Sequence, residues 1–235
     1  MMPMLIRREY GAVEMAWDVE DVQGLSHALS ESPDSFLISM WNLKARGASA
    51  PLETGVLYSL WKVYAGVEFR ISLFYVANNL ATVGERTYLL ALVGEYDGFK
   101  SMLLDAWADG LSINWSDLSV QYGDSWLTVC RELASKTNWI QATVDANLIV
   151  LDAEGLRSEQ DLYFRLGEAF FGYRGYAGSN LDAFYDVLRE NGLDCEIAFK
   201  DRKQFSTVCE TLTNDASYFD KLIKVFLDAG LRIRE

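Results

Sequence analysis

The chain has 235 residues, of which 50% are apolar and 13% aromatic, so it is long enough for two domains with packed cores. A charged fraction of 23% and a low content of Gly and Pro exclude a disordered or collagen-like chain. The net charge of −13 disfavours binding to nucleic acid or to an anionic membrane and favours a basic partner.

The cysteines and the uncharged stretches limit the class of protein further. Cys130, Cys195 and Cys209 are odd in number and widely spaced, without a C-x-x-C motif, which argues against a disulfide framework and a zinc site. The longest uncharged stretch, residues 71–84, is too short to span a bilayer, and the N-terminus lacks the pattern of a signal peptide. We expect a cytoplasmic protein without a metal or another cofactor.

The first part of the chain, residues 1–145, predicts an α+β domain with mostly antiparallel strands. Apolar and β-branched runs predict strands at 36–41, 57–64, 68–76 and 87–93, and apolar spacing predicts helices at 21–29, 98–108 and 124–134. The only histidine, His27, falls in the first of these helices, where a lone histidine is more often a surface or core residue than a catalyst. No Ser-His-Asp or Cys-His set can be assembled without it. Nothing in this part identifies a function.

The pattern changes near residue 145, so residues 146–235 are predicted to form a second domain. Ser158 and Asp161 have the spacing of a capping box that opens a helix. Short apolar strands are predicted at 147–151, 195–199 and 231–234, and helices at 158–170, 180–189 and 216–229, with a glycine-rich turn at 172–178. This order predicts a small α/β domain with a three-stranded parallel sheet and packed helices.

The helix at 180–189 carries two carboxylates on one face. With Ser179 as the N-cap, Asp182 is the third helical residue and closes a capping box at the positive end of the helix. Asp186 lies one turn later, where like charges cost about 0.2–0.5 kcal/mol, and Arg189 could partly offset this cost. Two interpretations of Asp186 follow: a solvated surface charge, or part of an acidic face that binds a partner.

This segment resembles the signature of the barstar family, intracellular inhibitors of barnase-type ribonucleases. In that family an aromatic-aromatic-Gly-x-Asn-Leu-Asp-Ala-x-Trp-Asp run forms the inhibitory loop and helix. The matching run is Tyr-Ala-Gly-Ser-Asn-Leu-Asp-Ala-Phe-Tyr-Asp at residues 176–186. The resemblance covers about residues 147–235 and implies the family's fold of three parallel strands with packed helices.

The resemblance also implies roles for individual residues. Asp186 would be the principal anchor in the phosphate site of the nuclease, Asp182 would lie beside it, and Tyr176 would pack over the catalytic histidine of the nuclease. The implied partner-binding set is completed by Gly178 and Asn180, which would shape the loop, by Tyr185 on the helix, and by Asp228 as a peripheral acidic contact.

Two positions depart from the family pattern and bear on the target. Ala177 replaces the second aromatic residue of the loop, and Tyr185 replaces the tryptophan of the helix. The contacts at the rim would therefore be reduced or rearranged, which leaves open whether barnase itself is the target.

The expected function is that of a non-enzymatic immunity protein that blocks a ribonuclease with an acidic helix. One alternative is a module that neutralises another basic protein, such as a different nuclease toxin. A second is an enzyme with its site in residues 1–145. That part of the chain could instead contact a larger toxin, mediate dimerisation or cap the second domain.

Overall fold

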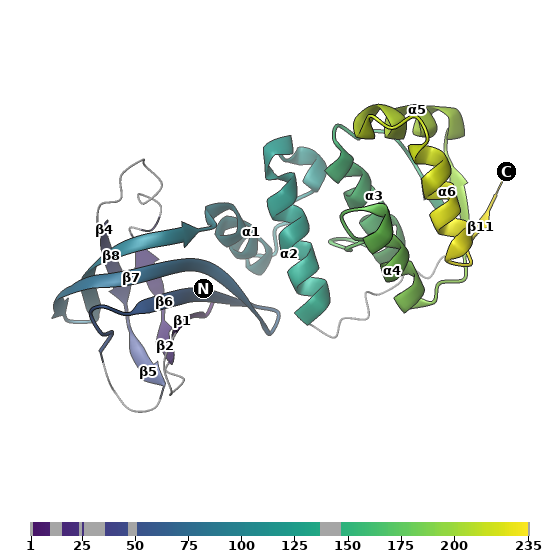
Figure 1. Cartoon of the computed structure of the whole chain (residues 1–235). Coiled ribbons are helices and arrows are strands. Elements are labelled where there is room, and N and C mark those ends of the chain that lie inside the picture. The colour runs from purple at the N-terminus through teal and green to yellow at the C-terminus, as the bar shows by residue number, and fades with distance from the viewer. Residues whose placement is uncertain are drawn as a thin grey trace. The chain divides into compact units, whose positions relative to one another are not determined.

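The computed structural model describes residues 2–9, 16–23, 25, 36–46, 51–136 and 147–234. Contacts divide the chain into two compact units, Met1–Ile113 and Asn114–Glu235 (Figure 1). None of the described helices is long and apolar enough to cross a membrane. The domain boundary expected at residue 145 falls in the segment 137–146, outside the described residues, and stays a prediction.

The first unit is built on an antiparallel sheet of eight strands in the order β3-β4-β8-β7-β6-β1-β2-β5. The expected α+β class with antiparallel strands is confirmed. The elements are β1 (Met4–Arg8), β2 (Ala16–Val19), β3 (Asp21–Gln23), β4 (Phe36–Trp41), β5 (Lys44–Arg46), β6 (Leu57–Tyr64), β7 (Val67–Val83), β8 (Arg86–Tyr96) and α1 (Gly98–Ala108).

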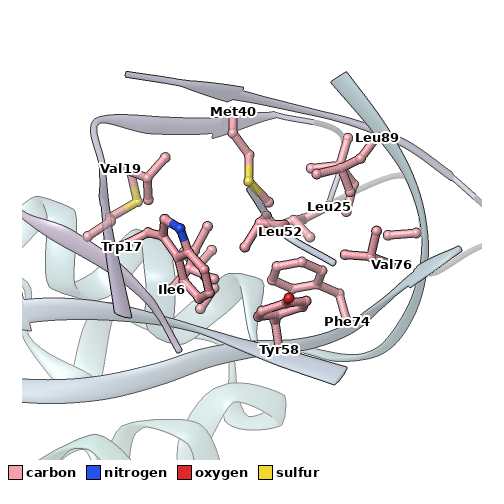
Figure 2. Close-up of a cluster of buried hydrophobic side chains, with 14 residues drawn as sticks. Ile6, Trp17, Val19, Leu25, Met40, Leu52, Tyr58, Phe74, Val76 and Leu89 are labelled. Atoms are coloured by element: carbon pink, nitrogen blue, oxygen red, sulfur yellow. The ribbon is translucent and has the colours of Figure 1, made fainter. Parts of the chain in front are cut away.

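Aromatic side chains organise the core of this unit (Figure 2). The ring of Tyr58 meets Trp17 edge-on at 5.5 Å between centroids and stacks on Phe74 at 5.9 Å. All three side chains are almost completely buried. They extend from β2, β6 and β7 into one cluster, so this sheet has a core of its own.

Two expectations for the first unit differ from the structure. The strands expected at 68–76 and 87–93 are longer, because β7 and β8 continue pairing beyond the apolar core as far as Val83 and Arg86. The helix expected at 21–29 is wrong where it is described, because Asp21–Gln23 forms strand β3 and pairs with β4. His27 lies outside the described residues.

The second unit contains a three-stranded parallel sheet in the order β11-β10-β9, as expected. Two short 3-10 turns, η2 (Trp115–Asp117) and η3 (Val120–Tyr122), lead into its first helix. The other elements are α2 (Gly123–Lys136), β9 (Leu148–Leu151), α3 (Glu159–Phe171), α4 (Leu181–Asn191), β10 (Glu196–Phe199), α5 (Arg202–Thr213), α6 (Tyr218–Asp228) and β11 (Arg232–Ile233).

Helix α5 was not predicted from the sequence. It is mostly polar and buries only Phe205 and Cys209, and Asp201 caps it by accepting a hydrogen bond from the Gln204 amide. The remaining helices pack through aromatic side chains. The rings of Phe170, Phe184 and Phe226 lie 5.7–6.0 Å apart, which joins α3, α4 and α6.

Candidate functional site

The glycine-rich loop between α3 and α4 is held by contacts that exclude larger residues. Gly178 has φ +89°, and a Cβ there would lie 2.7 Å from the Phe184 nitrogen. A Cβ on Gly175 would lie 2.2 Å from the carbonyl oxygen of Gly167 on α3. The loop therefore packs against both helices at van der Waals distance, which only glycine allows.

Helix α4 begins one residue later than the sequence predicted. Asn180 is the N-cap, and its Oδ1 accepts a hydrogen bond from the Ala183 amide at 2.8 Å. Ser179 is therefore not the cap, and Asp182 is the second helical residue rather than the third. Asn is at least as good an N-cap as Ser, and its extended backbone follows directly from the turn at Gly178. Asp182 still lies in the first turn, at the positive end of the helix.

The two carboxylates of α4 face solvent. Asp182 and Asp186 are both exposed, and within the described part of the chain neither side chain has a hydrogen bond or an ion pair. The guanidinium of Arg189, which could have offset Asp186, instead lies 5.6 Å from the ring centroid of Tyr185. The opposite face of α4 is anchored in the core by Phe184. The helix thus presents negative charge that its own neighbours do not neutralise.

The other predicted site residues lie around this helix. Tyr176 and Tyr185 are half-buried, whereas Ala177 is completely buried and contributes nothing to the surface of the loop. Asp228 is exposed on the last turn of α6. That helix packs against α4 through the rings of Phe184 and Phe226, so Asp228 lies on a neighbouring helix rather than in the loop.

Comparison with known proteins identifies the part of the chain that carries this loop and helix. Residues 146–235 match the family model described as Barstar (barnase inhibitor). These residues form a barstar-family domain. The family is one of inhibitors rather than enzymes, and its partners are ribonucleases. No curated protein and no solved structure matches the chain.

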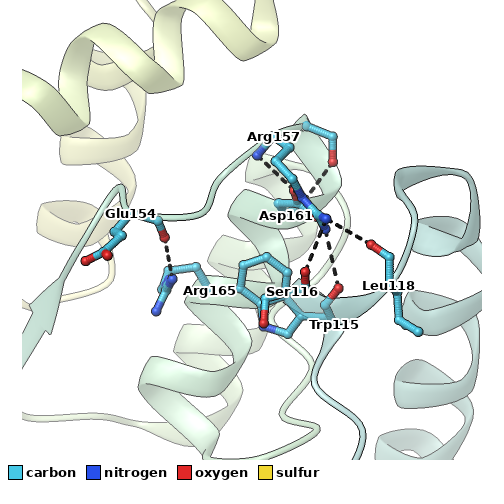
Figure 3. A network of polar contacts seen from close by, with 8 residues as sticks. Trp115, Ser116, Leu118, Glu154, Arg157, Asp161 and Arg165 are labelled. Carbon is cyan, nitrogen blue, oxygen red and sulfur yellow. Dashed lines mark hydrogen bonds and ion pairs between the residues drawn. The ribbon is translucent and has the colours of Figure 1, made fainter.

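The segment before the family match is attached to the barstar-family domain (Figure 3). The guanidinium of Arg157 donates to the carbonyl oxygens of Ser116 and Leu118 at 3.2 and 2.9 Å, and to the buried carboxylate of Asp161 at 3.0 Å. On the same side of α3, the indole of Trp115 donates to Glu168 at 2.8 Å. Residues 115–118 are therefore fixed to α3 by polar contacts.

A small cavity lies between α2 and the glycine-rich loop. It has a volume of about 210 Å³ and is lined by Asp124, Leu127, Thr128 and Arg131 of α2 together with Tyr176 and Ser179 of the loop. The sequence predicted α2 as a helix but assigned it to the first domain. The sequence signal for packing on another helix was the apolar face of α2, whose residues Trp126, Val129 and Leu133 are buried.

Burial shifts the pKa of several titratable groups of the second unit. Burial raises the pKa of all three cysteine thiols, that of Cys209 to about 12. Burial also raises the pKa of Glu168, against the opposing effect of its hydrogen bond from Trp115. Among the described residues, no group of three or more His, Cys, Asp or Glu side chains could hold a metal ion. The loop and α4 carry the exposed carboxylates of Asp182 and Asp186 and the half-buried rings of Tyr176 and Tyr185.

Proposed function

We propose that this protein inhibits a ribonuclease by placing the loop 172–180 and helix α4 in its active site. The observation that carries the proposal is Asp186, an exposed carboxylate that forms no ion pair with any described residue, on a helix of a barstar-family domain. A ribonuclease active site holds a phosphodiester with cationic side chains. The carboxylates of Asp186 and Asp182 would take the place of the phosphate without being cleaved.

The rigidity of the loop supports this mechanism. Gly178 contacts the backbone of the first turn of α4, Asn180 caps that helix, and Phe184 anchors it in the core. A surface that is ordered before binding loses little conformational entropy in the complex, which favours tight binding. In this mechanism Gly178 and Asn180 set the shape of the loop and do not supply the main contact energy.

Charge over the whole chain supports the same partner. A net charge of −13 would attract a basic ribonuclease and accelerate the encounter at low ionic strength. Tyr176 and Tyr185 would pack against the rim of the nuclease site, and Asp228 would make a peripheral contact. The chain would then act in the cytoplasm as an immunity protein without catalytic activity of its own.

A titration of ribonuclease activity tests the proposal. The full chain is added to barnase and to any ribonuclease encoded in a reading frame next to that of this protein. We expect an equimolar amount of the chain to abolish RNA cleavage by at least one of these ribonucleases, and the association rate to fall as salt is raised. Undiminished cleavage by all of them would overturn the proposal.

A further inference from the structure

We infer that α2, which lies outside the family match, is a second part of the ribonuclease-binding surface, and that its pocket beside the loop receives one long basic side chain of the nuclease. The inference rests on the proposed function, because it needs a ribonuclease seated on the loop. It goes beyond that function by adding an element that the barstar-family match does not contain.

The first step is that α2 has a fixed position on the barstar-family domain. The ring of Trp126 meets Phe164 of α3 edge-on at 6.4 Å, and Gln160 donates to the Asp124 carboxylate at 3.3 Å. A Cβ on Gly123 would lie 3.4 Å from that of Gln160, so the start of α2 lies directly on α3. The inner face of α2 is thus anchored, and its outer face has a defined position beside the loop.

The second step is that this outer face and the loop form one pocket. The lining residues of α2 have the spacing of a single helix face, and the other wall is the loop residues Tyr176 and Ser179. Tyr176 is also the residue expected to contact the nuclease. A ribonuclease that covers Tyr176 would therefore cover the mouth of the pocket as well, so the pocket continues the proposed interface.

The third step is the chemistry of the lining. Leu127 and the ring of Tyr176 provide apolar surface for a hydrocarbon stem, while the exposed carboxylate of Asp124 offers acceptor positions for a cation. Arg131 lies seven residues after Asp124, about 10 Å along the helix, so it borders the other end of the pocket. A cavity of about 210 Å³ holds a single side chain. A lysine or arginine of a basic nuclease fits this pocket when its cation lies at Asp124, at the end away from the cation of Arg131.

A filled pocket gives the direct test, and the chain offers a matched control. Thr128 lines the pocket, and its hydroxyl donates to the Asp124 carbonyl oxygen at 2.8 Å. Thr207 on α5 makes the same contact with the Lys203 carbonyl oxygen at 3.0 Å and is exposed. Thr128→Tyr and Thr207→Tyr therefore make the same change at threonines with the same backbone hydrogen bond, and they differ in that Thr128 is half-buried in the pocket. We expect Thr128→Tyr to raise the dissociation constant at least tenfold and Thr207→Tyr to leave it within twofold.

The charge of the bound side chain is tested separately by Asp124→Asn. Asp220→Asn on α6 is the control, because it removes the same single negative charge away from the pocket. We expect Asp124→Asn to weaken binding at least fivefold at low salt and the loss to shrink at high salt. Equal affinities of the two variants would overturn the assignment of a basic side chain.

The outcomes separate this inference from the proposed function. If the unmodified chain inhibits one of these ribonucleases, Asp186→Ala loses inhibition, and Thr128→Tyr behaves like Thr207→Tyr, the pocket inference is wrong while the proposed function stands. If the unmodified chain inhibits neither barnase nor any neighbouring ribonuclease, both are wrong. Circular dichroism of Thr128→Tyr must match the unmodified chain, so that the loss reports contact rather than unfolding.

Discussion

Replacing Gly178 by alanine should distort the loop between α3 and α4 more than its backbone conformation alone would require. The residue has φ +89°, and an alanine in the left-handed region costs about 1–2 kcal/mol. Its Cβ would also lie 2.7–2.9 Å from backbone and Cβ atoms of Ala183 and Phe184, so the loop or the first turn of α4 must shift. Forced overpacking of this kind costs about 1–3 kcal/mol. The two effects together predict a loss of about 2–5 kcal/mol.

Gly192 provides the control for this prediction. It ends α4 with φ +57°, and a Cβ added there would meet nothing within 4 Å. Gly192→Ala therefore carries the conformational cost of about 1–2 kcal/mol without the steric one. The difference between the two variants isolates the contact of the loop with α4.

Thermal unfolding followed by circular dichroism measures both variants. For a unit of this size about 1 kcal/mol corresponds to roughly 4 °C in Tm, so Gly178→Ala should melt several degrees below Gly192→Ala. It should also lose more inhibition, because a shifted loop is no longer ordered for binding. Equal melting temperatures for the two variants would refute the argument that close packing on α4 fixes the loop.

Three further predictions concern the support of the site. Arg157→Ala removes the hydrogen bonds to Ser116, Leu118 and Asp161. Because the arginine is partly exposed, we expect the free energy of unfolding in urea to fall by about 2–4 kcal/mol. Amide exchange in residues 115–118 should become faster, and unchanged exchange there would contradict the attachment. Burial raises the pKa of Glu168, so the folded state binds its proton more tightly than the unfolded chain and stability falls as the pH rises above the ordinary value of 4.5. Glu168→Gln should therefore be more stable than the unmodified chain at pH 7 and lose this advantage near pH 4; the opposite trend in Tm would contradict the shift. The three cysteines are buried with raised thiol pKa values, so a thiol reagent at pH 8 should label them slowly before unfolding and rapidly afterwards; rapid labelling of the folded protein would contradict their burial.

Most of the second unit could be predicted because its signals are local. A continuous apolar run indicated β9, and short segments with apolar residues indicated β10 and β11. Ser158 caps α3 by accepting from the Asp161 amide, as its spacing predicted. Helix α5 was missed because most of its residues are polar, although Phe205, Val208, Cys209 and Leu212 have the spacing of one helix face. The N-cap of α4 was placed one residue early because Ser179 and Asn180 are both good caps, and only the geometry of the turn at Gly178 decides between them.

The contacts of the candidate site were less predictable because they join distant parts of the chain. Asp186 was recognised from its spacing, but the position of Arg189 over Tyr185 depends on side-chain packing that no sequence pattern fixes. The attachment of residues 115–118 through Arg157, and the pocket between α2 and the loop, involve separations of about forty residues or more. At 21–23, pairing with β4 overrode a local pattern that favoured a helix.

The most direct test of the proposed inhibition compares Asp186→Ala with Asp220→Ala. Both aspartates are exposed, and Asp220 lies next to Phe219, which packs on Phe205 of α5 rather than on α4. The measurement is the dissociation constant for whichever ribonuclease the unmodified chain inhibits. Truncating one partner of a desolvated charge pair costs about 2–5 kcal/mol, a range to which barnase–barstar pairs themselves contribute. We therefore predict that Asp186→Ala weakens binding by roughly thirtyfold or more and Asp220→Ala by less than threefold. Equal dissociation constants for the two variants would contradict the role of Asp186 as the anchor of inhibition.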